Sequence, residues 1–237
     1  MIRVLRGLFI FTIVASTIFT AGFAEAEIRL PSIFWDNMVL QRNKPINVWG
    51  WADSLEEVTV QLDELSATTT ADSAGKWMVS LDPMGAGGPF SLVVAGEDTL
   101  SLSNVLIGEV WLASGQSNME MAMRKGTPSE WNTGIDNWEE EITDADYPAI
   151  RLFRIPKKTA GKPLPDVEAA WEICSPSTVG DFSAVGFFFG KELHQKLEVP
   201  IGLIQSAWGG TRIEPWTPPV GFEGIQTLNE ITREIED

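Results

Sequence analysis

A serine stands at the point where an apolar stretch ends and polar groups begin. Residues 107–121 read IGEVWLASGQSNMEM, so Ser117 directly follows a hydrophobic run. A strand leading into a tight turn and then a helix would bring this hydroxyl to a helix N-terminus, where backbone N–H groups favour developing negative charge. Such a placement suits a nucleophile for acyl transfer, but it equally suits an N-cap, which serine often provides. Because position 119 is methionine, the stretch does not match the Gly-x-Ser-x-Gly elbow of α/β-hydrolases.

A second candidate group follows another apolar run. Residues 201–212 read IGLIQSAWGGTR, and the paired Gly209 and Gly210 allow the backbone to approach a ligand closely. An exposed N–H in this loop would donate to an oxyanion, whereas the alternative is an ordinary turn. Arg212 and Glu214 follow as candidate substrate contacts, or as a surface ion pair. A guanidinium such as that of Arg212 suits a substrate carboxylate.

A serine nucleophile needs a base, and the chain has one histidine, His194. The pattern predicts a helix over 183–197 that ends before Pro200. His194 falls on its polar face, so we predict a surface residue rather than a catalytic base. The opposite, apolar face repeats every four residues and comprises Val185, Phe189, Leu193 and Leu197.

Two further features are predicted to be structural. Cys174 is the sole cysteine, so the chain has no internal disulfide, and we predict a buried thiol. The acidic residues between 130 and 146 are numerous enough to suggest a cation site, but their spacing matches no metal-binding loop. We therefore predict a solvated acidic insertion, with no metal and no cofactor.

The elements that must position these residues fall into two parts. From residue 28 to 104, apolar residues alternate between turn clusters, as in Val58, Val60 and Leu62, which predicts a β-sandwich domain over 27–104. Beyond residue 104 the apolar runs lose their alternation, as expected for parallel strands that are covered on both faces. These runs are 105–113, 150–155 and 201–206, with helical segments between them.

This order of elements predicts an α/β fold with an open, mostly parallel sheet after the sandwich. Functional sites in such sheets lie at the carboxyl ends of the strands, where both Ser117 and the glycine pair fall. Within the sandwich, Trp35, Trp49 and Trp51 are candidates for a sugar-stacking face. The alternative is that they fill the core or the contact with the next domain.

Composition and the N-terminus restrict the partners. With 33 acidic and 17 basic residues the formal net charge is −16, which argues against nucleic acid as a partner.

Residues 1–26 combine two arginines, an apolar run and small residues at the end, which predicts a signal peptide and a secreted or periplasmic protein. The alternative is an uncleaved anchor, but the run is shorter than the ~20 residues of a typical span, so we expect no stable membrane insertion.

Three segments together resemble the sialate O-acetylesterase group of SGNH-type carbohydrate esterases. Two of them follow hydrophobic strands and read GQSNM from residue 115 and WGGTRIEPW from residue 208. The third lies near the start and reads LPSIF from residue 30 and DNMVLQR from residue 36. The likeness covers nearly all of residues 28–220, and its specificity comes from the combination of motifs.

The resemblance implies that residues 105–237 form the N-terminal part of an SGNH-like esterase domain. It also implies that Ser117 attacks the carbonyl of an O-acetyl group on a sugar, without metal or cofactor. The oxyanion would be held by backbone N–H groups of Ser117 and of Gly209 or Gly210, with a side-chain amide as third donor. The substrate contacts that the resemblance suggests are Gln116, Asn118, Arg212 and Glu214.

The sequence departs from the family pattern in one respect. The family's third-donor asparagine and its Asp-x-x-His pair lie further towards the C-terminus and do not occur here. We therefore expect the sequence to lack a C-terminal part and to be inactive alone. The leading prediction is an esterase acting on acetylated sugars, sialic acid or another. The alternative is a secreted carbohydrate-binding protein that carries an incomplete esterase remnant.

Overall fold

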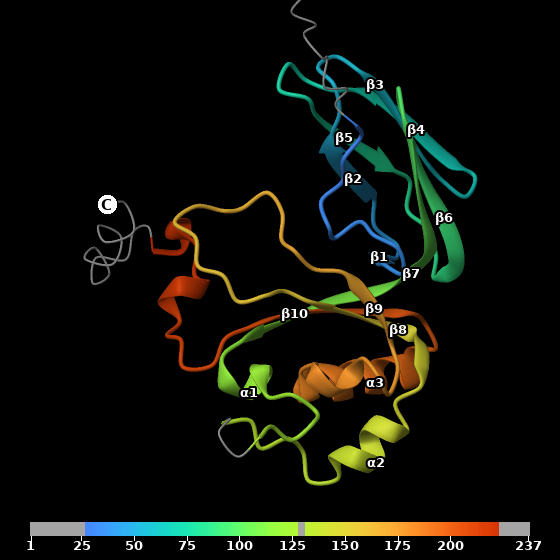
Figure 1. The fold of residues 1–237 in the computed structure, drawn as a ribbon. Coiled ribbons are helices and arrows are strands. Elements are labelled where there is room, and N and C mark those ends of the chain that lie inside the picture. Colours follow the sequence, from blue (N-terminus) through green and yellow to red (C-terminus); the bar gives the residue numbers. More distant parts are fainter. Residues whose placement is uncertain (1–26, 128–130, 223–237) are drawn as a thin grey trace, which may run out of the picture.

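The computed structural model describes residues 27–127 and 131–222 (Figure 1). The predicted signal peptide and Glu130 of the acidic stretch lie outside these residues. The described chain forms a mixed α/β fold with one large sheet and few helices. Its strands are β1 Val39–Gln41, β2 Ile46–Trp51, β3 Glu57–Leu62, β4 Leu65–Thr70, β5 Lys76–Leu81, β6 Gly87–Ala95, β7 Thr99–Gly115, β8 Tyr147–Arg154, β9 Trp171–Cys174 and β10 Ile201–Ala207. Its helices are α1 Ser117–Glu120, α2 Trp138–Thr143 and α3 Ala184–Leu197, with 3-10 turns at Val179–Asp181, Glu214–Trp216 and Pro219–Phe222.

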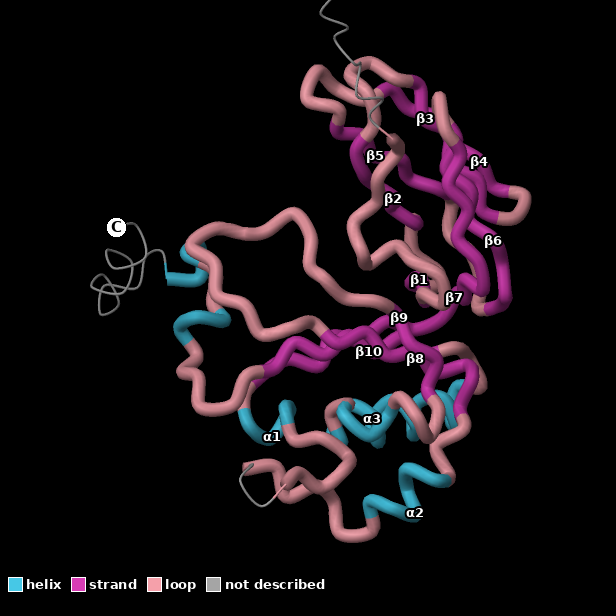
Figure 2. Tube along the Cα trace, viewed as in Figure 1, coloured by secondary structure: helices cyan, strands magenta, loops and turns pink. Residues whose placement is uncertain are grey.

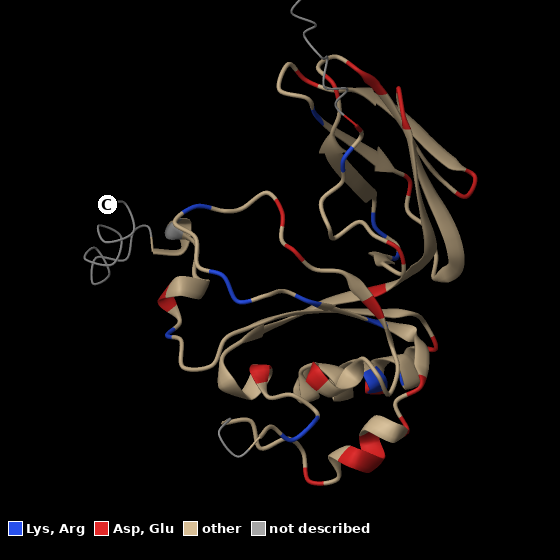
Figure 3. Ribbon diagram, in the orientation of Figure 1, with Lys and Arg blue, Asp and Glu red and all other residues tan. Residues whose placement is uncertain are grey.

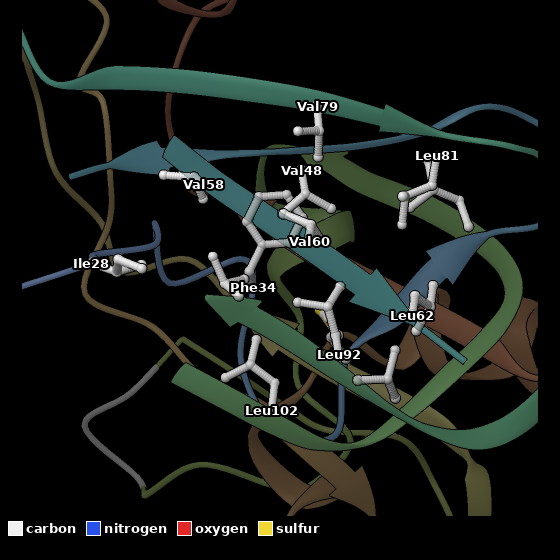
Figure 4. Close-up of a cluster of buried hydrophobic side chains, with 14 of the residues drawn as sticks. Ile28, Phe34, Val48, Val58, Val60, Leu62, Val79, Leu81, Leu92 and Leu102 are labelled. Carbon is white, nitrogen blue, oxygen red and sulfur yellow. The ribbon is translucent and has the colours of Figure 1, made fainter. Parts of the chain in front are cut away.

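The first strands follow the predicted alternation. β2 and β5 pair antiparallel as a two-stranded sheet, while β4, β3, β6 and β7 are neighbours in the large sheet. Every second side chain points inward, so Val48 from β2, Val60 from β3 and Leu92 from β6 are fully buried. Figure 4 shows these side chains pointing toward one another as one hydrophobic cluster. Period-two burial of this kind is what half-buried strands require.

β7 takes part in both the antiparallel and the parallel pairing of the large sheet without a break. Its first half pairs antiparallel with β6, and residues 109–115 pair parallel with β10. The predicted domain boundary at residue 104 therefore falls inside one strand. Asn104 has a left-handed φ of 56° at this point, which changes the direction of the side chains while the strand continues. The four residues that follow, 105–108, are all buried, so the alternation ends here although the strand does not.

The predicted parallel strands are confirmed. β10 lies between β7 and β8 and pairs parallel with both, so Ile201 is in register with Glu109 and with Ile150. β9, which the sequence did not predict, adds antiparallel to β8 at the edge. The sheet is therefore mixed rather than mostly parallel. In Figures 1 and 2 the helices α1, α2 and α3 lie on one side of these strands.

The predicted helix over 183–197 is confirmed, but its buried face is not the predicted one. Ser183 caps α3 by accepting a hydrogen bond from the Gly186 N–H at 3.0 Å. Phe187 and Gly190 face the sheet, whereas Phe189 is 43% exposed. A Cβ on Gly190 would lie 2.6 Å from the Leu203 side chain, so glycine is what lets α3 approach β10. Small residues on the contact face are invisible to a search for apolar repeats.

Arg151 ties the two parts of the chain together. This β8 residue is 3% exposed and donates to the carbonyl oxygens of Asn37, at 3.0 Å, and Pro148, at 2.9 Å. It also donates to the side chain of Asn104, at the left-handed position in β7. Burial lowers the pKa of the Arg151 guanidinium. Several backbone acceptors therefore hold one buried cation at the junction between the antiparallel and parallel pairings.

None of the helices within residues 27–127 and 131–222 has the length and hydropathy needed to cross a membrane.

Candidate active site

The two predicted site segments leave the sheet side by side. β7 ends at Gly115, and β10 ends at Ala207, its register partner. The Trp208 N–H donates to the Gly115 carbonyl at 2.9 Å, which extends the pairing into the loops. Because neighbouring parallel strands end at the same edge, the Ser117 turn and the glycine loop start from adjacent points.

Ser117 is the first residue of α1 and is not its cap. The cap is Gln116, whose side chain accepts from the Ser117 N–H at 3.3 Å, so the N-cap alternative for Ser117 is wrong. α1 ends at Glu120, because the next residues pair elsewhere: the Ala184 N–H donates to Met121, and the Met123 N–H donates to Phe182. The helix expected after the Ser117 turn is therefore one turn only. A single turn has little dipole, so α1 by itself does not create an anion site.

The Ser117 hydroxyl donates to the Gln116 side-chain oxygen at 3.0 Å, and no base contacts it among the described residues. His194 lies at the other end of the sheet. Its Nδ1 is 2.8 Å from the carbonyl oxygen of Val199, which precedes β10. Since β10 spans seven residues, this end lies roughly 20 Å from the carboxyl end. His194 is half-buried, and its position excludes direct contact with Ser117 in this conformation.

Gly209 packs against Ser117. A Cβ on Gly209 would lie 3.4 Å from both Cα and Cβ of Ser117 and 2.8 Å from Glu120 Oε2. The Gly209 N–H donates to that Glu120 oxygen. Gly210 has a φ of 79° and open space around its Cα, and its N–H has no partner within the described chain. The structure thus brings Ser117 and the glycine pair together and leaves the second glycine's N–H free.

Hydrogen bonds within the glycine loop fix its shape. The Thr211 hydroxyl donates to the Trp208 carbonyl at 2.6 Å, and the Trp216 indole N–H donates to the Thr211 hydroxyl at 2.8 Å. Arg212 is exposed and forms no ion pair with Glu214 in the described structure. Glu214 Oε2 is buried without a hydrogen-bond partner there. The surface-pair alternative for these two residues is therefore wrong. Asn118 is exposed on α1.

A cavity of about 620 Å³ opens beside α1 and reaches Glu120 and Ala207. Its volume falls in the range of ligand pockets, which is about 300–1,000 Å³. Trp131 and Asn132 supply an aromatic face and an amide to its lining. Arg154 also lines it, and its guanidinium makes one bond, at 3.5 Å to the Asp181 carbonyl. The Arg154 guanidinium therefore keeps N–H donors for a ligand, whereas the Asn132 amide donates to the Arg124 carbonyl at 2.9 Å.

The loops around this cavity carry basic residues, although the chain is acidic (Figure 3). Arg124 pairs with Asp181, and Lys157 pairs with Glu120. The acidic residues that suggested an insertion lie partly on α2, where Glu141 pairs with Lys191 at 3.1 Å. Within the described chain, no group of three or more His, Cys, Asp or Glu is arranged to hold a metal ion.

Glu120 and Lys157 also belong to the site, although no sequence motif marks them. Glu120 stands three residues after Ser117, so both lie in the single turn of α1. A carboxylate at this spacing from a candidate nucleophile was the available signal. Lys157 lies 5.8 Å from the centre of the Trp208 ring, in a loop that no motif marked.

The predicted tryptophans have separate surroundings. Trp49 is 41% exposed and Trp35 is 52% exposed, so neither fills the core. Trp49 meets the edge of Phe34, with ring centres 4.6 Å apart, and Arg29 covers Trp51 at 4.3 Å. β2 points its alternate residues, Val48 among them, into the core instead.

Comparisons with known proteins agree on one family. Residues 107–236 match the family described as carbohydrate esterase, sialic acid-specific acetylesterase. The chain is 34% identical to the sialate O-acetylesterase of Rattus norvegicus over 89% of this chain and 41% of that protein. It is 34% identical to the sialate O-acetylesterase of Homo sapiens over 80% of this chain and 38% of that protein.

A solved structure shares the fold. A carbohydrate acetylesterase from Xanthomonas citri superposes with a TM-score of 0.76 and 36% identity, covering 83% of this chain and 44% of that one. The present chain thus spans about two fifths of the length of the relatives it matches.

Proposed function

Because the chain belongs to the sialic acid-specific acetylesterase family of carbohydrate esterases, we propose that it supplies the nucleophile of a serine esterase acting on O-acetylated sugars. The observation that carries this proposal is the packing of Gly209 against Ser117 at the carboxyl ends of β7 and β10. An acyl transfer needs a nucleophile in contact with the carbonyl carbon and N–H donors within hydrogen-bond distance of its oxygen, and two neighbouring loops supply both.

In the proposed reaction the Ser117 Oγ attacks the acetyl carbonyl while its proton passes to a base. The sugar hydroxyl leaves, and water then releases acetate from the acyl-enzyme. The N–H groups of Ser117 and of Gly209 or Gly210 bind the oxyanion, each worth on the order of 10²-fold or more in rate. The hydroxyl now donates to Gln116, so this bond must break before a base takes the proton.

We assign the sugar to the cavity beside α1. Trp131 offers a face for a sugar ring, and Arg154 and Asn132 offer polar contacts. The exposed Arg212 is a second guanidinium within the glycine loop, where a substrate carboxylate would be bound in a bidentate manner. Gln116, Asn118 and Glu214 complete the proposed substrate contacts. A sialic acid carries such a carboxylate, whereas a neutral acetylated sugar does not.

The proposal also covers the division of the chain into domains and an export signal. We interpret residues 27–104 as a β-sandwich, which the common core of the β2–β5 sheet and the large sheet supports. We interpret residues 105–237 as the front part of an SGNH-like domain and residues 1–26 as an export signal, which makes the protein secreted or periplasmic.

The test is to label the chain with a fluorophosphonate and locate the adduct by mass spectrometry, with imidazole added as an external base. We expect the adduct on Ser117, and we expect p-nitrophenyl acetate with imidazole to leave an acetyl group on the same residue. Ser117→Ala should reduce both signals to background. Ser114→Ala is the matched control, because Ser114 is an exposed serine at the end of β7.

Equal labelling of the wild type and Ser117→Ala would overturn the role of Ser117. The alternative function, a carbohydrate-binding protein with an esterase remnant, is supported by the exposed rings of Trp35 and Trp49. Binding of an acetylated oligosaccharide with no acyl-enzyme, even with imidazole, would favour it.

A further inference from the structure

Glu120 links three loops at the carboxyl ends of the strands. It lies on α1, after β7, and its Oε2 accepts the N–H of Gly209, which follows β10. Its Oε1 pairs with Lys157, which follows β8. One carboxylate thus connects the ends of three adjacent strands.

The carboxylate is well shielded, because 13% of the Glu120 side chain is exposed. A shielded carboxylate needs partners for its oxygens, and each oxygen has one. Lys157 also neutralises the charge, which matters beside a site where an oxyanion forms. An unpaired carboxylate in the same helical turn as Ser117 would oppose the negative charge that develops on the oxyanion.

The contact determines where Gly209 lies relative to Ser117. Glu120 and Ser117 share a single helical turn, so a bond from Glu120 to the Gly209 N–H fixes that backbone against the serine. The bond also occupies the Gly209 N–H. Gly210, whose N–H has no partner in the described chain, is the glycine that remains available for an oxyanion.

We propose that Glu120 is a positioning residue for the oxyanion site. Its carboxylate, neutralised by Lys157, holds Gly209 beside Ser117 so that the Gly210 N–H faces the reacting carbonyl. Glu120 itself does not touch the substrate's reacting atoms. This inference rests on the proposed role of Ser117, but the contact that it describes is measurable without any catalysis.

The first measurement is the backbone amide spectrum of the chain by NMR. A charge-assisted hydrogen bond moves an amide proton downfield. We expect the Gly209 amide to lie downfield in the wild type and to move upfield in Glu120→Ala, with a smaller change in Glu120→Gln. Glu192→Ala is the matched control, since Glu192 is an exposed glutamate on α3 that pairs with Lys196.

The second measurement is the rate at which a fluorophosphonate labels Ser117. Misplacing the donors should slow labelling by about 10²-fold in Glu120→Ala. Glu120→Gln keeps an oxygen that accepts from Gly209 and should retain most of the rate. A residue that served only global stability would not show this rescue, and thermal unfolding of each variant checks for it.

The two measurements separate the two proposals. An unchanged Gly209 amide in Glu120→Ala would overturn the positioning role, as would equal labelling rates in the wild type and Glu120→Ala. If the wild type shows no labelling of Ser117 even with imidazole as an external base, the esterase proposal fails. The amide shift then still decides whether Glu120 holds Gly209.

Discussion

At the scale of single residues, the site depends on contacts between side chains and backbone groups of neighbouring loops. Ser117, Gly209 and the glycine that follows were visible in the sequence, because their types and spacing suggest acyl transfer. Glu120 was not, because a glutamate is ordinary on a helix until its partners are known. The contact between Glu120 and Gly209 crosses 89 residues of chain, and no local pattern encodes it.

Cys174 confirms a residue-scale prediction. It is buried, as expected for a lone thiol, and burial raises its pKa to about 12. The native state therefore keeps the thiol proton at pH values where the unfolded chain, with an ordinary pKa near 9.0, releases it. Stability from this group is complete below pH 9 and is lost as the pH rises towards 12. The slope is about 1.4 kcal/mol per pH unit for one proton.

We expect Cys174→Ala to flatten the fall in the free energy of unfolding between pH 9 and pH 12, as measured by urea denaturation. All other ionisable groups are the same in both proteins, so the difference between the two curves isolates the thiol. Identical slopes would show that Cys174 is accessible to water in the native protein. The wild-type thiol should also resist Ellman's reagent until the chain unfolds.

At the scale of elements, α3 shows why the spacing of apolar residues was an incomplete guide. The apolar repeat predicted the helix correctly but not its buried face. Val185 and Phe189 are 47% and 43% exposed, while Phe187 is fully buried and Gly190 approaches Leu203 of β10. The close approach of α3 to the sheet depends on a glycine, which a search for apolar repeats does not mark.

The close approach of α3 to β10 depends on the absence of a side chain at Gly190. Gly190→Leu should destabilise the protein by about 1–3 kcal/mol, because its side chain would overlap Leu203, which is fully buried. The measurement is the urea midpoint of unfolding. Gly161→Leu is the matched control, since nothing lies within 4 Å of a Cβ there. A neutral Gly190→Leu would mean that α3 can move away from β10 at little cost.

At the scale of the whole molecule, the β7 edge of the parallel strands is apolar and exposed within the described chain. On β7, Trp111 is 44% and Leu112 is 64% exposed, and within the described chain residues 109–115 of this strand pair with β10 alone. On α3, Phe189 meets Trp111 edge to face, with ring centres 5.1 Å apart. A shallow cavity of about 240 Å³ lies between these elements.

We expect this surface, comprising Trp111, Leu112, Val185 and Phe189, to bind a neutral apolar dye such as Nile red, because large contiguous apolar patches are uncommon on soluble proteins. Leu112→Ser with Phe189→Ser should reduce dye fluorescence several-fold. Leu55→Ser with Met78→Ser is the control, since these exposed apolar residues lie outside the surface. An equal loss in both double variants would show that the dye has no preferred face.

The sequence by itself determined the local structure and the candidate chemistry. Alternation at Val58, Val60 and Leu62 predicted strands, unbroken apolar runs predicted the parallel pairs, and the motifs around Ser117 and Gly209 predicted the family and its nucleophile. These signals are local, because burial of one side chain depends on its neighbours along one strand.

Tertiary structure alone decided what depends on contacts between distant residues. One continuous strand, β7, runs through residue 104, where the sequence predicted a domain boundary. His194 lies at the far end of the sheet from Ser117, and Glu120 contacts Gly209. Tertiary structure also exposed Trp49, which the sequence could equally have placed in a core. The physical reason is that strand order and helix approach depend on packing between segments far apart in the chain, which no local spacing records.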